Sequence, residues 1–148
     1  MIPKEIISSL VHKAYAELDE PSARVCHDII FFLSSHKSGD MQHITYQTIM
    51  NGLHKNEVST LFDNDDLVLH MMRSLDYLTS SKLHILDIHF QFYGPTEDEP
   101  SYIDKSELAE AIVSGKFYHP ESGEEVEDFR KYIFPFFSPS SYWMSINE

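Results

Sequence analysis

Apolar residues recur at spacings of three and four over the first third of the chain, the period of amphipathic helices. Ile6, Leu10 and Ala14 share one face of a helix expected over residues 3–19, and Pro3 suits its first turn. A second helix is predicted from Pro21 and Ser22, and its pattern breaks at residues 34–40. Its buried stripe holds Val25, Ile29, Phe32 and Leu33, with Cys26 and Ile30 widening it.

Two further helices follow from capping residues. Thr45 suits the N-cap of a short helix, and Asp63 or Asn64 suits the N-cap of a longer helix that runs to about Ser80. The inward face of that longer helix carries Leu67, Met71, Leu75 and Leu78. Its outward face carries Asp65, Asp66, Arg73 and Asp76.

After the longer helix, apolar residues recur at every second position. Over residues 86–92, apolar side chains at even positions alternate with polar ones, which predicts a half-buried strand with its even positions inward. Residues 94–100 are rich in Gly, Pro and acids and form an expected turn. Residues 101–103 are expected to return as the antiparallel partner strand.

A last helix is predicted from Asp104. Glu107 follows three residues later, a capping-box spacing, and Gly115 marks the stop. Leu108, Ala111 and Ile112 are expected to point inward.

The C-terminal tail is rich in aromatic residues. Pro135 and Pro139 exclude a regular helix interior and favour extended backbone. We expect the tail to fold back on the helices with Phe134, Phe136 and Phe137 largely buried. The alternative is that the part beyond Pro139, with Tyr142 and Trp143, docks on a partner or on a second copy of the chain.

Length and composition bound the architecture. The 148 residues, 42% of them hydrophobic, suffice for one sizeable core, so we expect a single domain over 1–148. Its parts are an N-terminal helix (1–19), a core (21–103), and a C-terminal helix with the aromatic tail (104–148). The fold class is α+β and mostly helical. No stretch approaches a membrane span, and the one cysteine, Cys26, favours a reducing, cytoplasmic setting.

The formal net charge of −13 disfavours direct binding to nucleic acid and to anionic membranes. The excess is uneven, because residues 94–128 carry eleven acids against two lysines. A surface of one sign instead favours a protein partner with a basic surface.

The order of elements over residues 21–103 resembles the winged-helix arrangement: helix, short helix, longer helix, strand, tip and strand. The resemblance implies that residues 65–80 stand in the place of the recognition helix and residues 94–100 at the tip of the wing. Winged helices most often bind DNA with those two elements. Here the helix offers Arg73 against three aspartates and the tip offers acids, so the resemblance implies the fold without the DNA-reading chemistry.

No catalytic, cofactor-binding or metal-binding residue is predicted. Gly-rich phosphate loops, nucleophile elbows and zinc-binding His-Glu-x-x-His pairs are absent from the sequence. Asp87 with His89, and His84 nearby, give too few ligands for a metal site and suit a solvated hairpin face. His119 before Glu121 suits a turn followed by an acidic surface.

The leading hypothesis is a non-catalytic acidic protein-interaction module: an adaptor, a regulator or a small subunit of an assembly. The alternatives are a DNA-binding winged-helix regulator, an inhibitor that mimics nucleic acid, and a small enzyme with scattered residues. The residues expected to contact a partner are Asp65, Asp66, Arg73, Asp76, Glu97, Asp98, Glu99, Tyr142 and Trp143.

Overall fold

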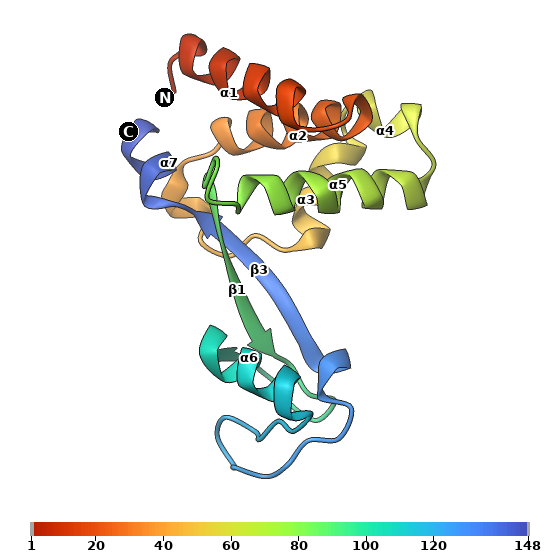
Figure 1. The fold of residues 1–148 in the computed structure, drawn as a ribbon, viewed down its shortest axis with the longest axis vertical. Helices are drawn as coiled ribbons and strands as arrows, with labels where there is room; N and C mark the ends of the chain where they lie inside the picture. The colour runs from red at the N-terminus through yellow and green to blue at the C-terminus, as the bar shows by residue number, and fades with distance from the viewer. Residues whose placement is uncertain (1, 148) are drawn as a thin grey trace. The chain divides into compact units, whose positions relative to one another are not determined.

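The computed structural model describes residues 2–147 and shows an α+β fold that is mostly helical (Figure 1). In chain order the elements are α1 (Lys4–Glu17), α2 (Glu20–Ser34), the 3-10 turn η1 (Ser38–Asp40), α3 (Tyr46–His54), α4 (Val58–Leu61), α5 (Asn64–Leu78), β1 (Leu86–Phe92), β2 (Ser101–Ile103), α6 (Lys105–Ser114), η2 (Phe129–Tyr132), β3 (Ile133–Pro139) and α7 (Ser141–Ile146).

The chain divides into two compact units. The first, here the helical unit, runs through Asp87 and resumes at Phe137, and the second, here the inserted unit, is Ile88–Phe136. The division falls inside β1 and β3, which therefore both belong partly to each unit. The expectation of one domain over the whole chain stays a prediction.

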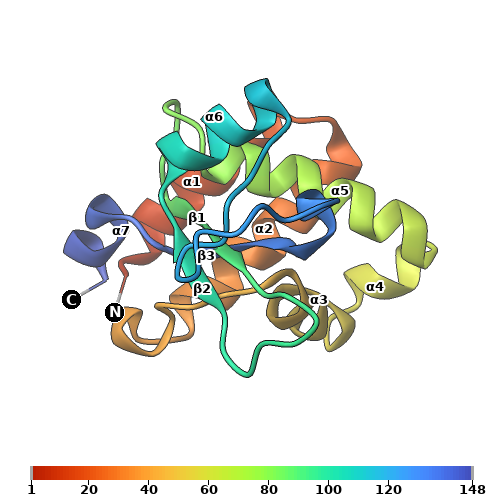
Figure 2. The same cartoon turned by 90° about the horizontal axis from the view of Figure 1, so that it is seen from below.

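Helix α2 is the centre of the helical unit. It packs against α1 on one side and α5 on the other, and it also contacts α3 and α4 (Figures 1 and 2). Its inward residues Val25, Ile29 and Leu33 are buried, as their spacing predicts. The helix at the heart of this core was therefore predicted correctly.

Side-chain caps fix where α2, α3 and α5 begin. Asp19 accepts a hydrogen bond from the Ser22 backbone N–H, Thr45 from Thr48, and Asp63 from Asp66. These bonds satisfy N–H groups that have no partner within the helix. The predicted caps at Thr45 and Asp63 are confirmed, and the predicted helix after Pro21 begins one residue earlier, at Glu20.

The three strands form one sheet in the order β2-β1-β3. β1 and β2 pair antiparallel, with Phe90 opposite Ile103 and Phe92 opposite Ser101, so the predicted strand pair is confirmed. The expected alternation along β1 holds in part: Leu86 and Phe92 are buried, whereas the even positions between them are half-buried.

The end of β3 is held inside the helical unit by backbone hydrogen bonds. Ile44 and Phe137 exchange two of them, with N···O distances of 2.8 and 2.7 Å, and the Ser140 N–H donates to the Ile85 carbonyl. Farther along, the Asn147 side-chain amide donates to the His36 carbonyl at the end of α2. The tail therefore folds back on the chain's own helices, as predicted.

The inserted unit has a small aromatic core of its own. Buried side chains from β1, β2, α6 and the segment before β3 form it: Phe92, Ile103, Leu108, Ala111, Phe117 and Phe129. Helix α6 ends as predicted at Gly115, whose φ of 76° lies in the left-handed region that favours glycine. Ile112 does not point inward as predicted, because it lies at the edge of the stripe made by Leu108 and Ala111 and is half exposed.

The aromatic tail is buried in part. Phe137 is fully buried and Phe136 half-buried, but Phe134 is exposed, so the expectation that all three are largely buried is wrong for Phe134. The segment is a strand, whose successive side chains point to opposite faces, and a run of aromatics cannot all face one core. Trp143 on α7 is 0% exposed.

No helix within residues 2–147 combines the length and the apolar character needed to cross a membrane.

We expect Trp143→Ala to lower the free energy of unfolding by about 3–5 kcal/mol, because it empties a fully buried site. Tyr142→Ala, its 44% exposed neighbour, should cost about 1 kcal/mol or less. Urea denaturation of the full chain measures both. Equal effects of the two variants would contradict the packing of α7.

Trp143→Phe should lower the free energy of unfolding by less than Trp143→Ala, because it leaves less of the site empty. A second effect acts in the same direction. The Trp143 indole N–H is buried and has no hydrogen-bond partner among the described residues, and phenylalanine removes that group.

Candidate functional site

The structure separates the residues expected to contact a partner into two groups. The helical unit holds Asp65, Asp66, Arg73 and Asp76 on α5 and Tyr142 and Trp143 on α7. The inserted unit holds Glu97, Asp98 and Glu99. Trp143 has to be removed from the set, because it is fully buried and cannot touch a partner in this conformation, whereas Tyr142 is exposed.

The outward side of α5 is more apolar than the predicted residues indicate. Leu67, Met71 and Leu75 pack inward, which turns positions 65, 69, 72 and 76 outward at spacings of three and four. Leu69 is 45% exposed and Met72 is 37% exposed. We call the set Asp65, Leu69, Met72 and Asp76, with Val68 and Arg73 at its sides, the α5 face.

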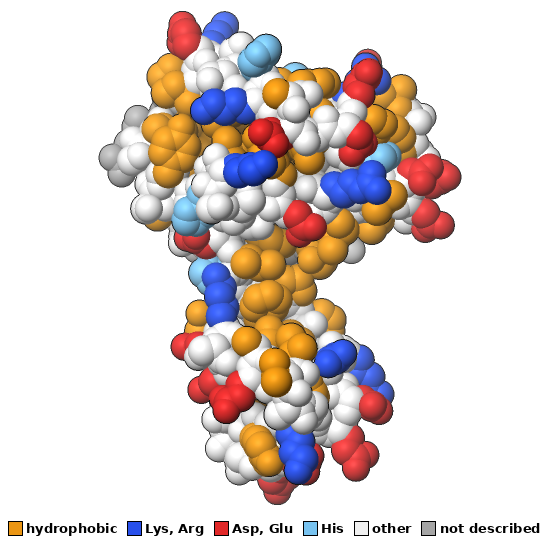
Figure 3. All heavy atoms as spheres, viewed as in Figure 1, with side chains coloured by type: hydrophobic (Ala, Val, Ile, Leu, Met, Phe, Trp, Pro, Cys, Tyr) orange, Lys and Arg blue, Asp and Glu red, His pale blue; other side chains and the backbone are white. Residues whose placement is uncertain are grey.

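Sequence reasoning identified the charged members of the α5 face and missed Leu69 and Met72. The signal was present: the two apolar residues fall between Asp65 and Asp76 on the face opposite the buried stripe. Figure 3 shows hydrophobic side chains reaching the surface of the helical unit among acidic and basic ones.

Arg73 is the one Arg or Lys of α5, and its charge is already engaged. Its guanidinium lies 3.5 Å from an oxygen of Asp19, which caps α2. The α5 face therefore presents apolar side chains and carboxylates, with its single basic group paired at the edge.

A buried polar cluster holds α5 against α2. The Ser22 hydroxyl donates to Asp19 at 3.1 Å and lies 3.1 Å from His70 Nδ1, so Nδ1–H completes the contact by donating to Ser22 Oγ. The Ser74 hydroxyl donates to the Ser22 carbonyl at 2.8 Å. Asp19, Ser22 and His70 are the residue types of a hydrolase triad, but Ser22 is 0% exposed and no substrate could reach its hydroxyl. The cluster fixes the packing of two helices.

Asp19 titrates below its ordinary range. Burial favours its neutral form, but the hydrogen bonds from Ser22 and the positive charge of Arg73 outweigh burial, so its pKa lies below 3.8. The ionised carboxylate is thus the form that the folded chain stabilises.

The single thiol is not poised for chemistry. Cys26 is 0% exposed, and burial raises its pKa to about 12. The expectation that Cys26 belongs to the core is confirmed.

In the inserted unit, the three acids of the 94–100 turn line a pocket of about 430 Å³ together with His119 and Glu121. His119 Nε2 is paired with a carboxylate oxygen of Glu97. His119 Nδ1 accepts the backbone N–H groups of Glu121 and Ser122 at 3.0 and 3.2 Å, so Nδ1 carries no hydrogen and Nε2–H donates to Glu97. His119 thereby ties two loops of the unit together.

The histidines and acids of β1 do not gather as a metal site. His84 Nε2 lies 2.6 Å from Asp87, an exposed pair at the start of the strand. His89 instead stacks on Phe136, with ring centroids 5.0 Å apart. Within residues 2–147 there is no group of three or more His, Cys, Asp or Glu side chains that could hold a metal ion.

Comparison with known proteins adds little to these observations. No family model matches the chain, and no solved structure matches it. The chain is 25% identical over 101 residues to proteins named "Peptide methionine sulfoxide reductase MsrA 2" from Staphylococcus aureus strains MW2, NCTC 8325 / PS 47 and Mu50 / ATCC 700699. The match covers 67% of this chain and 48% of each relative, so the chain spans about half the length of the curated relatives it matches.

We expect Asp19→Asn to destabilise the chain at neutral pH by about 0.5 kcal/mol, because asparagine keeps the cap but loses the exposed ion pair with Arg73. A carboxyl group whose folded pKa is depressed contributes stability above its unfolded pKa and loses it as pH falls through the folded value. The difference between variant and wild type should therefore narrow as pH falls below about 4 and disappear once pH is below the folded pKa. Urea denaturation at several pH values from neutral down to about pH 2 tests this; a difference that does not narrow in acid would contradict it.

We expect His119→Ala to speed hydrogen exchange at the Glu121 and Ser122 amides by about tenfold, because both lose their acceptor. His119→Asn, which keeps an acceptor oxygen near the position of Nδ1, should restore part of the protection. His84→Ala serves as the control on an exposed histidine pair. Exchange followed by NMR decides the outcome, and unchanged protection in His119→Ala would contradict this role.

Proposed function

We propose that this chain is a non-catalytic protein-interaction module with a winged-helix-like core, and that it docks a protein partner through the α5 face. The observation that carries the proposal is the exposure of Leu69 and Met72 between Asp65 and Asp76, on the outward side of a helix whose other side is buried.

Topology supports the winged-helix part of the proposal. Helices α2, α3 and α5 follow one another, strand β1 leaves α5, and β3 returns to bridge Ile44, which lies between α2 and α3. In this interpretation β1 and β3 are the strands of the wing, and residues 93–132, which run between them, are an insertion within it. The resemblance then extends beyond the 21–103 range taken from the sequence.

The chemistry of the α5 face supports a protein partner over DNA. A helix that reads the major groove needs donors and positive charge to approach base edges and phosphates. The α5 face instead combines carboxylates with exposed apolar side chains, and its one arginine is paired with Asp19. Apolar anchors surrounded by charge are the usual composition of a protein-binding surface.

We expect the double variant Leu69→Ser with Met72→Ser to reduce recovery of the bound partner by about tenfold or more, because anchor residues carry most of the binding energy. Recovery is measured by affinity capture from an extract of the producing cells, with the captured proteins quantified by mass spectrometry. Val113→Ser, at a site on α6 that is 89% exposed, is the matched control and should leave recovery unchanged. Circular dichroism checks that each variant is folded.

Two outcomes would contradict the proposal. Equal recovery by the double variant and the control would remove the α5 face as the docking surface. A sequence-dependent shift of duplex DNA at physiological salt, lost in Arg73→Ala, would favour the DNA-binding alternative.

A further inference from the structure

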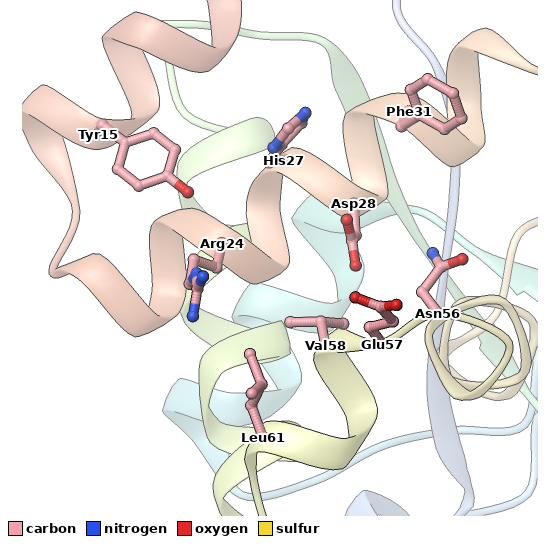
Figure 4. A pocket seen from close by; sticks show the side chains of 9 residues that line it. All are labelled: Tyr15, Arg24, His27, Asp28, Phe31, Asn56, Glu57, Val58 and Leu61. Carbon is pink, nitrogen blue, oxygen red and sulfur yellow. The ribbon is translucent and has the colours of Figure 1, made fainter.

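A second hollow lies on the other side of α2, between α1, α2 and the segment leading into α4 (Figure 4). Its volume is about 490 Å³. The α5 face contributes nothing to its lining, so it is a separate site. We call it the α1–α2–α4 groove.

Part of the groove wall is apolar and exposed. Tyr15 on α1, Phe31 on α2 and Leu61 on α4 all line it, and each is among the large hydrophobic side chains that the chain leaves in water. Phe31 is 59% exposed. Two aromatic rings and a leucine around one hollow form a site that a partner side chain could cover.

The middle of the groove carries negative charge. Figure 4 shows the carboxylates of Asp28 and Glu57 turned toward one another, while the Arg24 guanidinium lies on the other side of the pocket. Asp28 is half-buried and Glu57 is exposed at the start of α4.

Burial has the largest effect on the pKa of the Asp28 carboxyl. Burial raises its pKa above 3.8, and the opposing effects of His27, of a hydrogen bond from Asn56 and of Arg24 do not cancel the rise. A cation placed beside this carboxylate would favour its ionised form.

We propose that the α1–α2–α4 groove binds an arginine side chain of a partner protein, with Asp28 and Glu57 pairing the guanidinium and Tyr15 and Phe31 flanking it. This rests on the proposed function of the chain as a protein-interaction module and names the chemistry of a second contact. The net charge of −13 supports a basic occupant through charge complementarity.

Arginine fits better than lysine for a geometric reason. A planar guanidinium can donate to two carboxylates at once and lie against an aromatic ring, whereas an ammonium is a strongly hydrated point charge. Apolar side chains next to the arginine would cover Leu61 and the rings.

The test uses the full ¹⁵N-labelled chain and a capped tripeptide, acetyl-Leu-Arg-Leu-amide, followed by NMR titration. We expect saturable shifts at amides near residues 24–31 and 56–61. The citrulline peptide, which has the same shape but no charge, should bind about tenfold more weakly, and the lysine peptide should bind several-fold more weakly.

Substitutions in the groove test whether the peptide binds there. Glu57→Gln, at an exposed position, and Asp28→Asn should each weaken the arginine peptide by about fivefold. Glu110→Gln, an exposed acid of α6, is the matched control and should change nothing. Affinity should also fall as pH drops through the raised pKa of Asp28, because the neutral carboxyl no longer attracts the guanidinium. Tyr15, Arg24, His27 and Glu57 are the other titratable or charged groups lining the groove.

Equal binding of the arginine and citrulline peptides, or shifts spread over the acids of residues 97–99 and 121, would overturn the proposal. Failure here is distinguishable from failure of the proposed function. The peptide titration needs no native partner, and the α5 variants leave the groove intact. If the α5 variants lose partner recovery and the peptide does not bind the groove, the proposed function stands and only the groove proposal is refuted.

Discussion

The packing of α5 on α2 is the contact on which the presented surfaces depend. Ser22 and Ser74 are both fully buried where the two helices meet, and small side chains there let the backbones approach. The Ser74 hydroxyl reaches the Ser22 carbonyl across the interface, and His70 reaches the Ser22 hydroxyl. Because one side of α5 is fixed by this contact, Leu69 and Met72 have to face outward.

The helices and the first strand were predictable because their signals are local. Side-chain caps at Thr45 and Asp63 and a three-to-four spacing of apolar residues determine the ends and the inward faces of α3 and α5. The core of the inserted unit could not be predicted in the same way. Its core joins Phe92, Leu108, Phe117 and Phe129 across long stretches of sequence, and no local period records such contacts.

In the candidate sites, too, single residues could be identified from the sequence, but contacts between distant segments could not. The acids of the α5 face are visible in the sequence, but the ion pair of Arg73 with Asp19 joins residues on different helices. Likewise, the groove draws Tyr15, Asp28 and Glu57 from three separate segments. His119 is a further example: the acids beside it in sequence suggested a surface turn, but its carboxylate partner is the distant Glu97.

Both edges of the sheet have features that oppose pairing with another strand. A free edge strand invites pairing with another chain, and short length and proline are the ordinary ways to prevent it. One edge, β2, has three residues. The other edge, β3, contains Pro135 and Pro139, which cannot donate a hydrogen bond, and at Phe137 it is already bonded to Ile44. Addition of a partner strand is therefore disfavoured at both edges, which agrees with the proposal that a partner docks on helices.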